Sequence, residues 1–237
     1  MAKLKFDQAG KHFYENGVDH GVLFVENSNG FAEGVAWNGL TNVTLSPEGA
    51  EPNDIYADNI KYLSLMSVET LNATIEAYQS PVEFDACDGS MAIGSSTGAS
   101  IGQQERKKFA FAFRTKTGSD KTSDAGYKIH VVCGCLAAPS ERAYETINDS
   151  PDAMTLSWEV STTPESVTIN QKEFYTALFE IESKLYTKGT DGKITVSDNP
   201  KYTAVEDVLY GKDGAEGVAK APTYTSIQAL VDLVSGS

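Results

Sequence analysis

Hydrophobic and polar residues alternate with a period of two along the middle of this chain. In TLNATIEAYQ (70–79) every second residue from Leu71 to Ala77 is apolar, and the residues between them are Thr, Asn or Glu. Successive side chains of a β-strand point to opposite faces, so the pattern is typical of a half-buried strand. Three further segments repeat it: KFAFAFRTKT (108–117), GYKIHVVCGC (126–135) and AMTLSWEVST (153–162).

The segments between these strands are polar and rich in turn-forming residues. TGSDKTSDAG (117–126) contains Gly, Ser and Asp, and predicts a loop that joins two hairpin partners. A longer loop before the next strand is predicted for PSERAYETINDSP (139–151). Long strands joined in this way favour antiparallel sheets.

The pattern changes after about Ser166, where the apolar spacing becomes that of helices. EFYTALFEIESKLY (173–186) places apolar residues at steps of four, three and four, which predicts an amphipathic helix. TAVEDVLYG (203–211) predicts a second helix, with Thr203 as N-cap, Glu206 as its capping-box partner and Gly211 at its end. TSIQALVDLV (225–234) predicts a third.

Together these elements predict a β-rich α+β fold, a body of antiparallel strands with flanking helices. We expect residues 1–165 to form the β core with its loops. Residues 166–237 are expected to form a helical or extended segment packed on that core, within one domain overall. YGKDGAEGVAKAP (210–222) is interpreted as a flexible tether to the last helix.

Charge and composition narrow the functional classes. The chain has 237 residues, 41% of them hydrophobic, and carries 33 acidic against 19 basic residues for a net charge of −14. Such a surface repels phosphate, which disfavours a protein that grips nucleic acid. The opening stretch MAKLKFDQAGKHFYENG has no apolar run of signal-peptide length, from which we expect synthesis in the cytoplasm.

SPEGAEPNDIYADN (46–59) concentrates carboxylates on a loop that two prolines stiffen. Three interpretations are considered: a metal cage, a catalytic pair or a surface that another protein binds. The order of the acids does not follow an EF-hand loop, because no glycine and closing glutamate stand at the required positions. This mismatch disfavours a metal cage, and the other two interpretations stay open at this point.

The other residues that could take part in catalysis or metal binding form no convergent set. Cys133 and Cys135 are expected on one side of a strand, and they are interpreted as core cysteines because no second metal-ligand pair follows at zinc-finger spacing. His130 falls on the polar face of its strand and is expected at the surface or an interface. No nucleophile stands with a base in a known motif, so we expect no enzyme activity, metal or cofactor.

Several segments carry a specific resemblance to one family. Four segments resemble the major tail proteins of long, non-contractile-tailed phages of Gram-positive bacteria. They are GVAWNGLTNVTLSPEGAEPNDIYADNIKYLSL (34–65), ATIEAYQSPVEFDACDGS (73–90), IGQQERKKFAFAFRT (101–115) and APSERAYETINDSPDAMTLSWEVSTTP (138–164). AVEDVLYG (204–211) resembles the same family. The resemblance covers most of the chain from Gly34 to Pro164.

The resemblance implies a virion subunit. Six copies would form a ring, and stacked rings would form a hollow tail tube that conducts DNA during ejection. The implied fold is a β-sandwich or barrel flanked by a helix. Implied partners are other copies of the chain, a tape-measure protein and terminator or tip proteins, without a membrane. The protein would be made in the bacterial cytoplasm and end in the phage tail.

The acidic loop is then interpreted as an assembly arm that docks on a neighbouring subunit or ring. Ile55 and Tyr56 would anchor it, and charge reversal at Glu51 and Asp54 is expected to weaken assembly. The arm residues are Pro47, Glu48, Glu51, Pro52, Asp54, Ile55, Tyr56 and Asp58. The basic partner surface is Arg106, Lys107 and Lys108, and the candidates to line the lumen are Glu76 and Glu159.

Two other functions are weighed against a tube subunit. A tail terminator or collar protein would form a ring without open-ended polymerisation. A carbohydrate-binding β-sandwich would use exposed aromatic residues, and Trp37, Tyr56 and Tyr78 are the candidates for such a platform.

Overall fold

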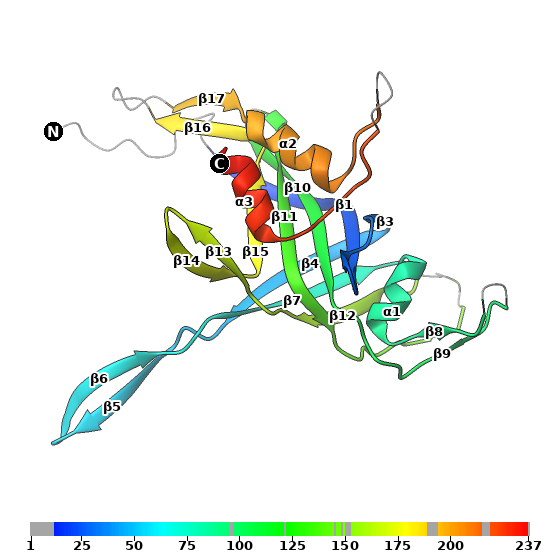
Figure 1. Ribbon diagram of the computed structural model, residues 1–237, viewed down its shortest axis with the longest axis horizontal. Coiled ribbons are helices and arrows are strands. Elements are labelled where there is room, and N and C mark those ends of the chain that lie inside the picture. The colour runs from blue at the N-terminus through cyan, green and yellow to red at the C-terminus, as the bar shows by residue number, and fades with distance from the viewer. Residues whose placement is uncertain are drawn as a thin grey trace.

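The computed structural model describes residues 12–94, 97–120, 122–144, 146–147, 149, 153–188, 194–214 and 219–236. All strand pairs in these residues are antiparallel, as the alternating segments predict. The largest sheet has the path β2-β1-β10-β11-β12-β7-β4, with β3 paired to β1 and β15 paired to β11. The protein is therefore β-rich, with two stacked portions of sheet consistent with a β-sandwich (Figure 1).

The strands of this sheet are β1 (Phe13–Asn27), β2 (Gly30–Phe31), β3 (Val35–Trp37), β4 (Leu40–Glu48), β7 (Thr70–Ala77), β10 (Phe109–Ser119), β11 (Thr122–Ala137), β12 (Leu156–Ser161) and β15 (Leu178–Glu182). Four separate two-stranded ribbons pair β5 (Pro52–Ala57) with β6 (Ile60–Met66), β8 (Met91–Ala92) with β9 (Ser100–Ile101), β13 (Glu165–Ile169) with β14 (Lys172–Thr176), and β16 (Lys184–Lys188) with β17 (Ile194–Asp198). The helices are η1 (Val82–Phe84), α1 (Asp85–Asp88), α2 (Pro200–Leu209) and α3 (Ile227–Ser235).

The hairpin β10–β11 lies at the centre of the molecule and is buried on both faces. On one face Ala110, Ala112 and Ile129 belong to the core that α2 and α3 cover. On the other face Phe109, Phe111 and other aromatic residues pack against β7 and β12. Figure 1 shows α2 and α3 over one side of β10–β11. The fold thus has a layer of helices, a central layer of strands and a second layer of strands.

The aromatic core between the two portions of sheet is a cluster of rings in edge contact. Trp37 lies 4.6 Å from Phe84, 5.4 Å from Phe111 and 5.4 Å from Trp158 between ring centroids. Aromatic pairs at these separations and tilts add to the stabilisation from burial alone. Trp37 is only 2% exposed, so it cannot belong to the carbohydrate platform considered above.

Two predictions of local structure need correction. Residues 173–186 are not a helix but parts of the strands β14, β15 and β16. The loop predicted over 117–126 does join two hairpin partners, but it is shorter than predicted, because β10 runs to Ser119 and β11 begins at Thr122. In both segments, backbone hydrogen bonds to a neighbouring strand override the local pattern of the sequence.

The helices at the C-terminal end occur where they are predicted, but their caps differ. Asn199 caps α2 by accepting a hydrogen bond from the Lys201 backbone N–H, and Pro200 occupies the first turn. Thr203 lies inside the helix, so the predicted capping box is wrong. Ser226 caps α3 through the Ala229 N–H. No helix in the described residues is long and apolar enough to cross a membrane.

The predicted tether after α2 is held to the body at both of its described ends. Lys212 and Lys220 exchange two backbone hydrogen bonds of 2.9 Å, and the Thr223 N–H donates to the Val208 carbonyl at 2.8 Å. Gly211 has φ of +78°, and a Cβ there would lie 2.7 Å from the Lys220 carbonyl oxygen. The chain therefore returns to α3 along a fixed path at these points.

Replacing Phe111 with alanine tests the aromatic core. Phe111 is 1% exposed, so Phe111→Ala is expected to lower the free energy of unfolding by about 3–5 kcal/mol. Phe174→Ala is the matched control, because that ring is 49% exposed on β14 and its loss should cost far less. Urea unfolding of the two variants measures both values, and equal losses would contradict this view of the core.

Candidate functional site

The segment predicted as a stiff acidic loop is a β-hairpin that stands away from the body (Figure 1). We call β5, β6 and their connection the arm (52–66). Its two-residue turn, Asp58-Asn59, has φ of +51° and +63°, the geometry of a type I′ turn that matches the twist of a hairpin. The assignment of this segment as a loop was therefore wrong.

The two prolines lie where strands tolerate them. Pro52 is the first residue of β5, and Pro47 belongs to β4, which is the last strand at one edge of the large sheet. Proline has no N–H to donate, so it fits edge positions and strand starts. At the base of the arm, Ser67 and Glu51 are joined by a backbone hydrogen bond of 3.3 Å and a side-chain hydrogen bond of 3.2 Å.

The register of the arm places three aliphatic side chains on one face and a mixed set, which includes Met66 and Tyr56, on the other. Ile55 pairs with Leu63, and Asn53 pairs with Leu65, which places these three apolar side chains on one face. Asp54 pairs with Ser64 on the opposite face. An irregularity between Ile55 and Tyr56 brings Lys61 opposite Tyr56. The predicted anchors Ile55 and Tyr56 therefore point to different faces.

Large hydrophobic side chains of the arm are exposed to a degree that is unusual for a monomer. Leu65 is 54% exposed, Tyr56 66%, and Ile55 and Leu63 a little under 40%. Ile60, Tyr62 and Met66 are exposed as well. An isolated two-stranded hairpin is only marginally stable in water, and exposed apolar patches mark contacts with partners. The apolar face formed by Ile55, Leu63 and Leu65 is the candidate functional surface.

The carboxylates of the arm are not equivalent. Asp54 receives a hydrogen bond from Lys61 at 2.7 Å and another from the Ser64 hydroxyl, and these two contacts lower the pKa of Asp54. Charge reversal at Asp54 would therefore disturb the arm itself. Asp58 at the turn of the arm is exposed, as are Glu48 and Glu51 in and after β4 at the base of the arm.

Of the three residues of the predicted basic surface, one side chain is hydrogen-bonded within the chain and two are exposed. Arg106 donates from Nη2 to the Asp88 carbonyl at 2.9 Å and packs against Gly89. Lys107 and Lys108 are exposed between β9 and β10. Figure 1 shows β9 at the end of the molecule away from the arm, so the structure does not bring the two surfaces together within one chain.

The two lumen candidates share one face of the sheet. Ser157 pairs with Glu76, and Glu159 pairs with Thr74, whereas Trp158 between them points into the core. Glu159 is exposed and Glu76 is partly buried. A pocket of about 380 Å³ on this side is lined by Glu159 together with polar residues, among them Ser46, Glu48, Asn72, Thr74 and Ser161. The outer face of β7 and β12 is thus polar and acidic.

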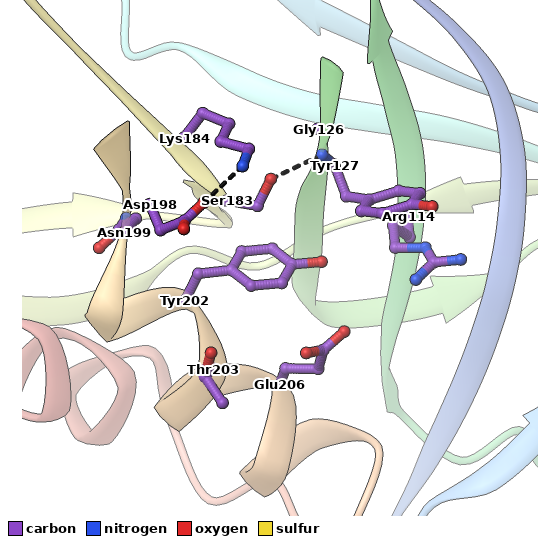
Figure 2. Close-up of a pocket in the computed structure, with 10 residues that line it drawn as sticks. All are labelled: Arg114, Gly126, Tyr127, Ser183, Lys184, Asp198, Asn199, Tyr202, Thr203 and Glu206. Carbon is purple, nitrogen blue, oxygen red and sulfur yellow. Dashed lines mark hydrogen bonds and ion pairs between the residues drawn. The ribbon is translucent and has the colours of Figure 1, made fainter. Parts of the chain in front are cut away.

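A second pocket of about 380 Å³ lies between β10, β11 and α2 (Figure 2). Arg114 lies over the Tyr127 ring, 4.1 Å from its centroid, and donates to Asp19 from Nε at 2.8 Å and from Nη2 at 3.1 Å. Lys184 pairs with Asp198. Burial raises the pKa of Tyr202 to about 12, so its hydroxyl stays protonated. These partners lie within the chain, and the arrangement contains no activated nucleophile.

The cysteines are buried, as predicted, but Cys133 and Cys135 lie on opposite faces of β11. Cys133 belongs to the core under the helices and Cys135 to the aromatic core. Gly134 between them has φ of +59°, and the pairing with β10 shifts register nearby. Burial raises the pKa of Cys133 to about 12. Among the described residues no group of three His, Cys, Asp or Glu side chains is placed to hold a metal.

His130 is buried, so the predicted surface position is wrong. It is 5% exposed and contacts Glu15, Thr115 and Glu180 on three neighbouring strands. Strand alternation places His130 correctly on the face opposite Ile129, but it does not reveal that Glu15 and Glu180 on neighbouring strands of the same sheet lie beside the ring.

Comparison with known proteins adds no identification: no protein-family model matches the chain, and a search of curated proteins finds no match. Function is therefore inferred from the surfaces described above.

The hydrogen bonds of Asp54 can be tested directly. Its pKa is lowered from the ordinary value of 3.8, chiefly by Lys61, because both contacts stabilise the ionised carboxylate. Lys61→Ala is expected to raise this pKa, measured by NMR titration of the carboxyl carbon. Lys107→Ala removes an exposed lysine away from the arm and should leave it unchanged. An unchanged titration in Lys61→Ala would contradict the contact.

Proposed function

We propose that this chain is a self-assembling structural subunit, namely the tail tube protein of a long-tailed phage. In this proposal six copies form a ring and the rings stack into a hollow tube through which DNA leaves the virion. The single observation that carries it is the arm, whose apolar face has no cover in the described part of the chain. The sequence resemblance to phage tail proteins supports the specific form.

The geometry of the arm favours contact with another copy of the same chain. A projecting element and its receiving surface, located at different places on one subunit, make a heterologous contact. Such contacts generate closed rings or open filaments. Docking of Ile55, Leu63 and Leu65 would remove apolar surface from water, which lowers the free energy by roughly 25 cal/mol per Å² of buried area. The hairpin is already formed before it docks, so less conformational entropy is lost on docking.

Charge supports the same arrangement. Glu51 at the base of the arm and Asp58 at its turn are acidic, and Lys107 and Lys108 are exposed in a different region of the chain. Between two copies these surfaces are complementary, which sets the orientation and rate of docking more than the affinity. Within one copy they cannot meet.

The acidic outer face of β7 and β12 suits the wall of a DNA conduit. In the proposed tube, Glu76 and Glu159 face the lumen, and their charges repel the phosphates of the passing genome. The net charge of −14 supports a wall to which DNA does not adhere. A tape-measure protein, a terminator and tip proteins would be the further partners in the virion.

The double variant Ile55→Ser/Leu63→Ser tests this function. It removes a cross-strand apolar pair and leaves the turn, Asp54 and Lys61 intact. We expect the concentration needed for assembly to rise at least tenfold, which corresponds to a loss of about 1.4 kcal/mol. Pelleting and light scattering measure assembly, and circular dichroism checks that the subunit stays folded.

Ile147→Ser is the matched control, because Ile147 is 84% exposed in the segment between β11 and β12. This variant should assemble like the unchanged protein. Normal assembly of the double variant would refute the role of the arm. Closed rings that never lengthen would instead support a terminator or collar subunit.

A further inference from the structure

His130 is the one polar residue that is buried in the described core. Its ring stacks on Phe113, with centroids 4.7 Å apart and planes within 8° of parallel. The two ring nitrogens point away from the aromatic core, toward carboxylates from two different strands. Glu15 comes from β1 on one side and Glu180 from β15 on the other.

The contacts of the ring are close on both sides. Nδ1 lies 2.7 Å from Oε1 of Glu180. Nε2 lies 3.0 Å from Oε1 of Glu15 and 2.9 Å from Oγ1 of Thr115. Lys128 Nζ lies 3.0 Å from the other carboxylate oxygen of Glu180 and 3.8 Å from that of Glu15. Glu182 on β15 adds a further negative charge near Lys128.

The number of available protons restricts the protonation state of the His130 ring. The Thr115 hydroxyl donates its single proton to Oε1 of Glu15 at 2.6 Å, so it has none left for His130. An ionised carboxylate only accepts hydrogen bonds, so both ring nitrogens must donate if both contacts are hydrogen bonds. A neutral ring would place a lone pair of one nitrogen against a carboxylate oxygen.

The ionisation state of Glu15 is consistent with a doubly protonated His130 ring. Burial by itself would raise the pKa of Glu15, but the hydrogen bond from Thr115 and the charges of Lys128 and His130 lower it overall. The carboxylate is therefore ionised at neutral pH and cannot supply the missing proton.

We propose that His130 is held as a doubly protonated imidazolium between Glu15 and Glu180, forming a pH-sensitive clasp that attaches β1 and β15 to the central hairpin. This inference is independent of the proposed assembly function. β15 is bound only to β11 in the sheet and lies in the chain between the ribbons β13–β14 and β16–β17. Its attachment therefore contributes to holding both ribbons on the body, together with the hydrogen bonds of the Ile227 N–H to Glu165 and of the Asn199 N–H to the Ser183 carbonyl.

The direction of the pH effect follows from the charges. The clasp is complete while the ring keeps both protons, and it weakens as rising pH removes one of them. At the acid end, the contribution of Glu15 is lost only as pH falls through its lowered pKa. The attachment of β15 should be strongest in mildly acidic to neutral solution and weaker in alkaline solution.

Two NMR measurements on the full chain test the clasp. Nitrogen-15 spectra of the imidazole rings at pH 7 should show both nitrogens of His130 protonated. Hydrogen exchange should show amide protection factors in β15 (Leu178–Glu182) that fall at least tenfold from pH 6 to pH 9, while those of β7 change little. A singly protonated His130 ring at pH 7 would overturn the proposal.

Variants separate the clasp from general pH effects. His130→Gln cannot carry a charge, so the protection of β15 should be low and independent of pH. His12→Gln alters a histidine whose side chain is 54% exposed near Asp120, and should retain the pH dependence of the unchanged protein. If His130→Gln fails to fold, His130→Phe, which keeps a ring stacked on Phe113 and cannot carry a charge, provides the same test. A pH dependence that persists in these clasp variants would refute the role of His130.

Discussion

Burial of both faces of the β10–β11 hairpin is the constraint on which the rest of the structure depends. Alanines at 110 and 112 let the helical side approach closely, and Phe109, Phe111 and Phe113 fill the space toward β7 and β12. Neither face can remain in water without exposing a large apolar area. The helices and the second portion of sheet are therefore both needed to complete the core.

This core is complete without the arm, so the apolar side chains of the arm are not part of it. The body of the subunit leaves Ile55, Leu63 and Leu65 uncovered on a preformed hairpin. A finished core and a separate exposed apolar ribbon are what the proposed assembly through the arm requires. In the proposed tube, the acidic outer face of β7 and β12 is a second functional surface, whose charge would repel the phosphates of passing DNA.

Much of this fold could be predicted from the sequence, because the period-two segments at 70–79 and 108–117 have one clear buried face. The helix expected at 173–186 was wrong because its apolar spacing fits both periods, and pairing of β15 with β11 decides between them. The arm was located but its hairpin was missed, although Asp58-Asn59 between two alternating runs is a turn signal. The burial of His130 depends on contacts remote in sequence, which no local pattern contains.

Negative-stain electron microscopy of the concentrated, purified protein, with assembled tail tips added as seeds in a parallel sample, tests the central claim most directly. The account predicts rings with six-fold symmetry that stack into hollow tubes, at least in the seeded sample. Uniform monomers at every concentration, with and without seeds, would contradict it.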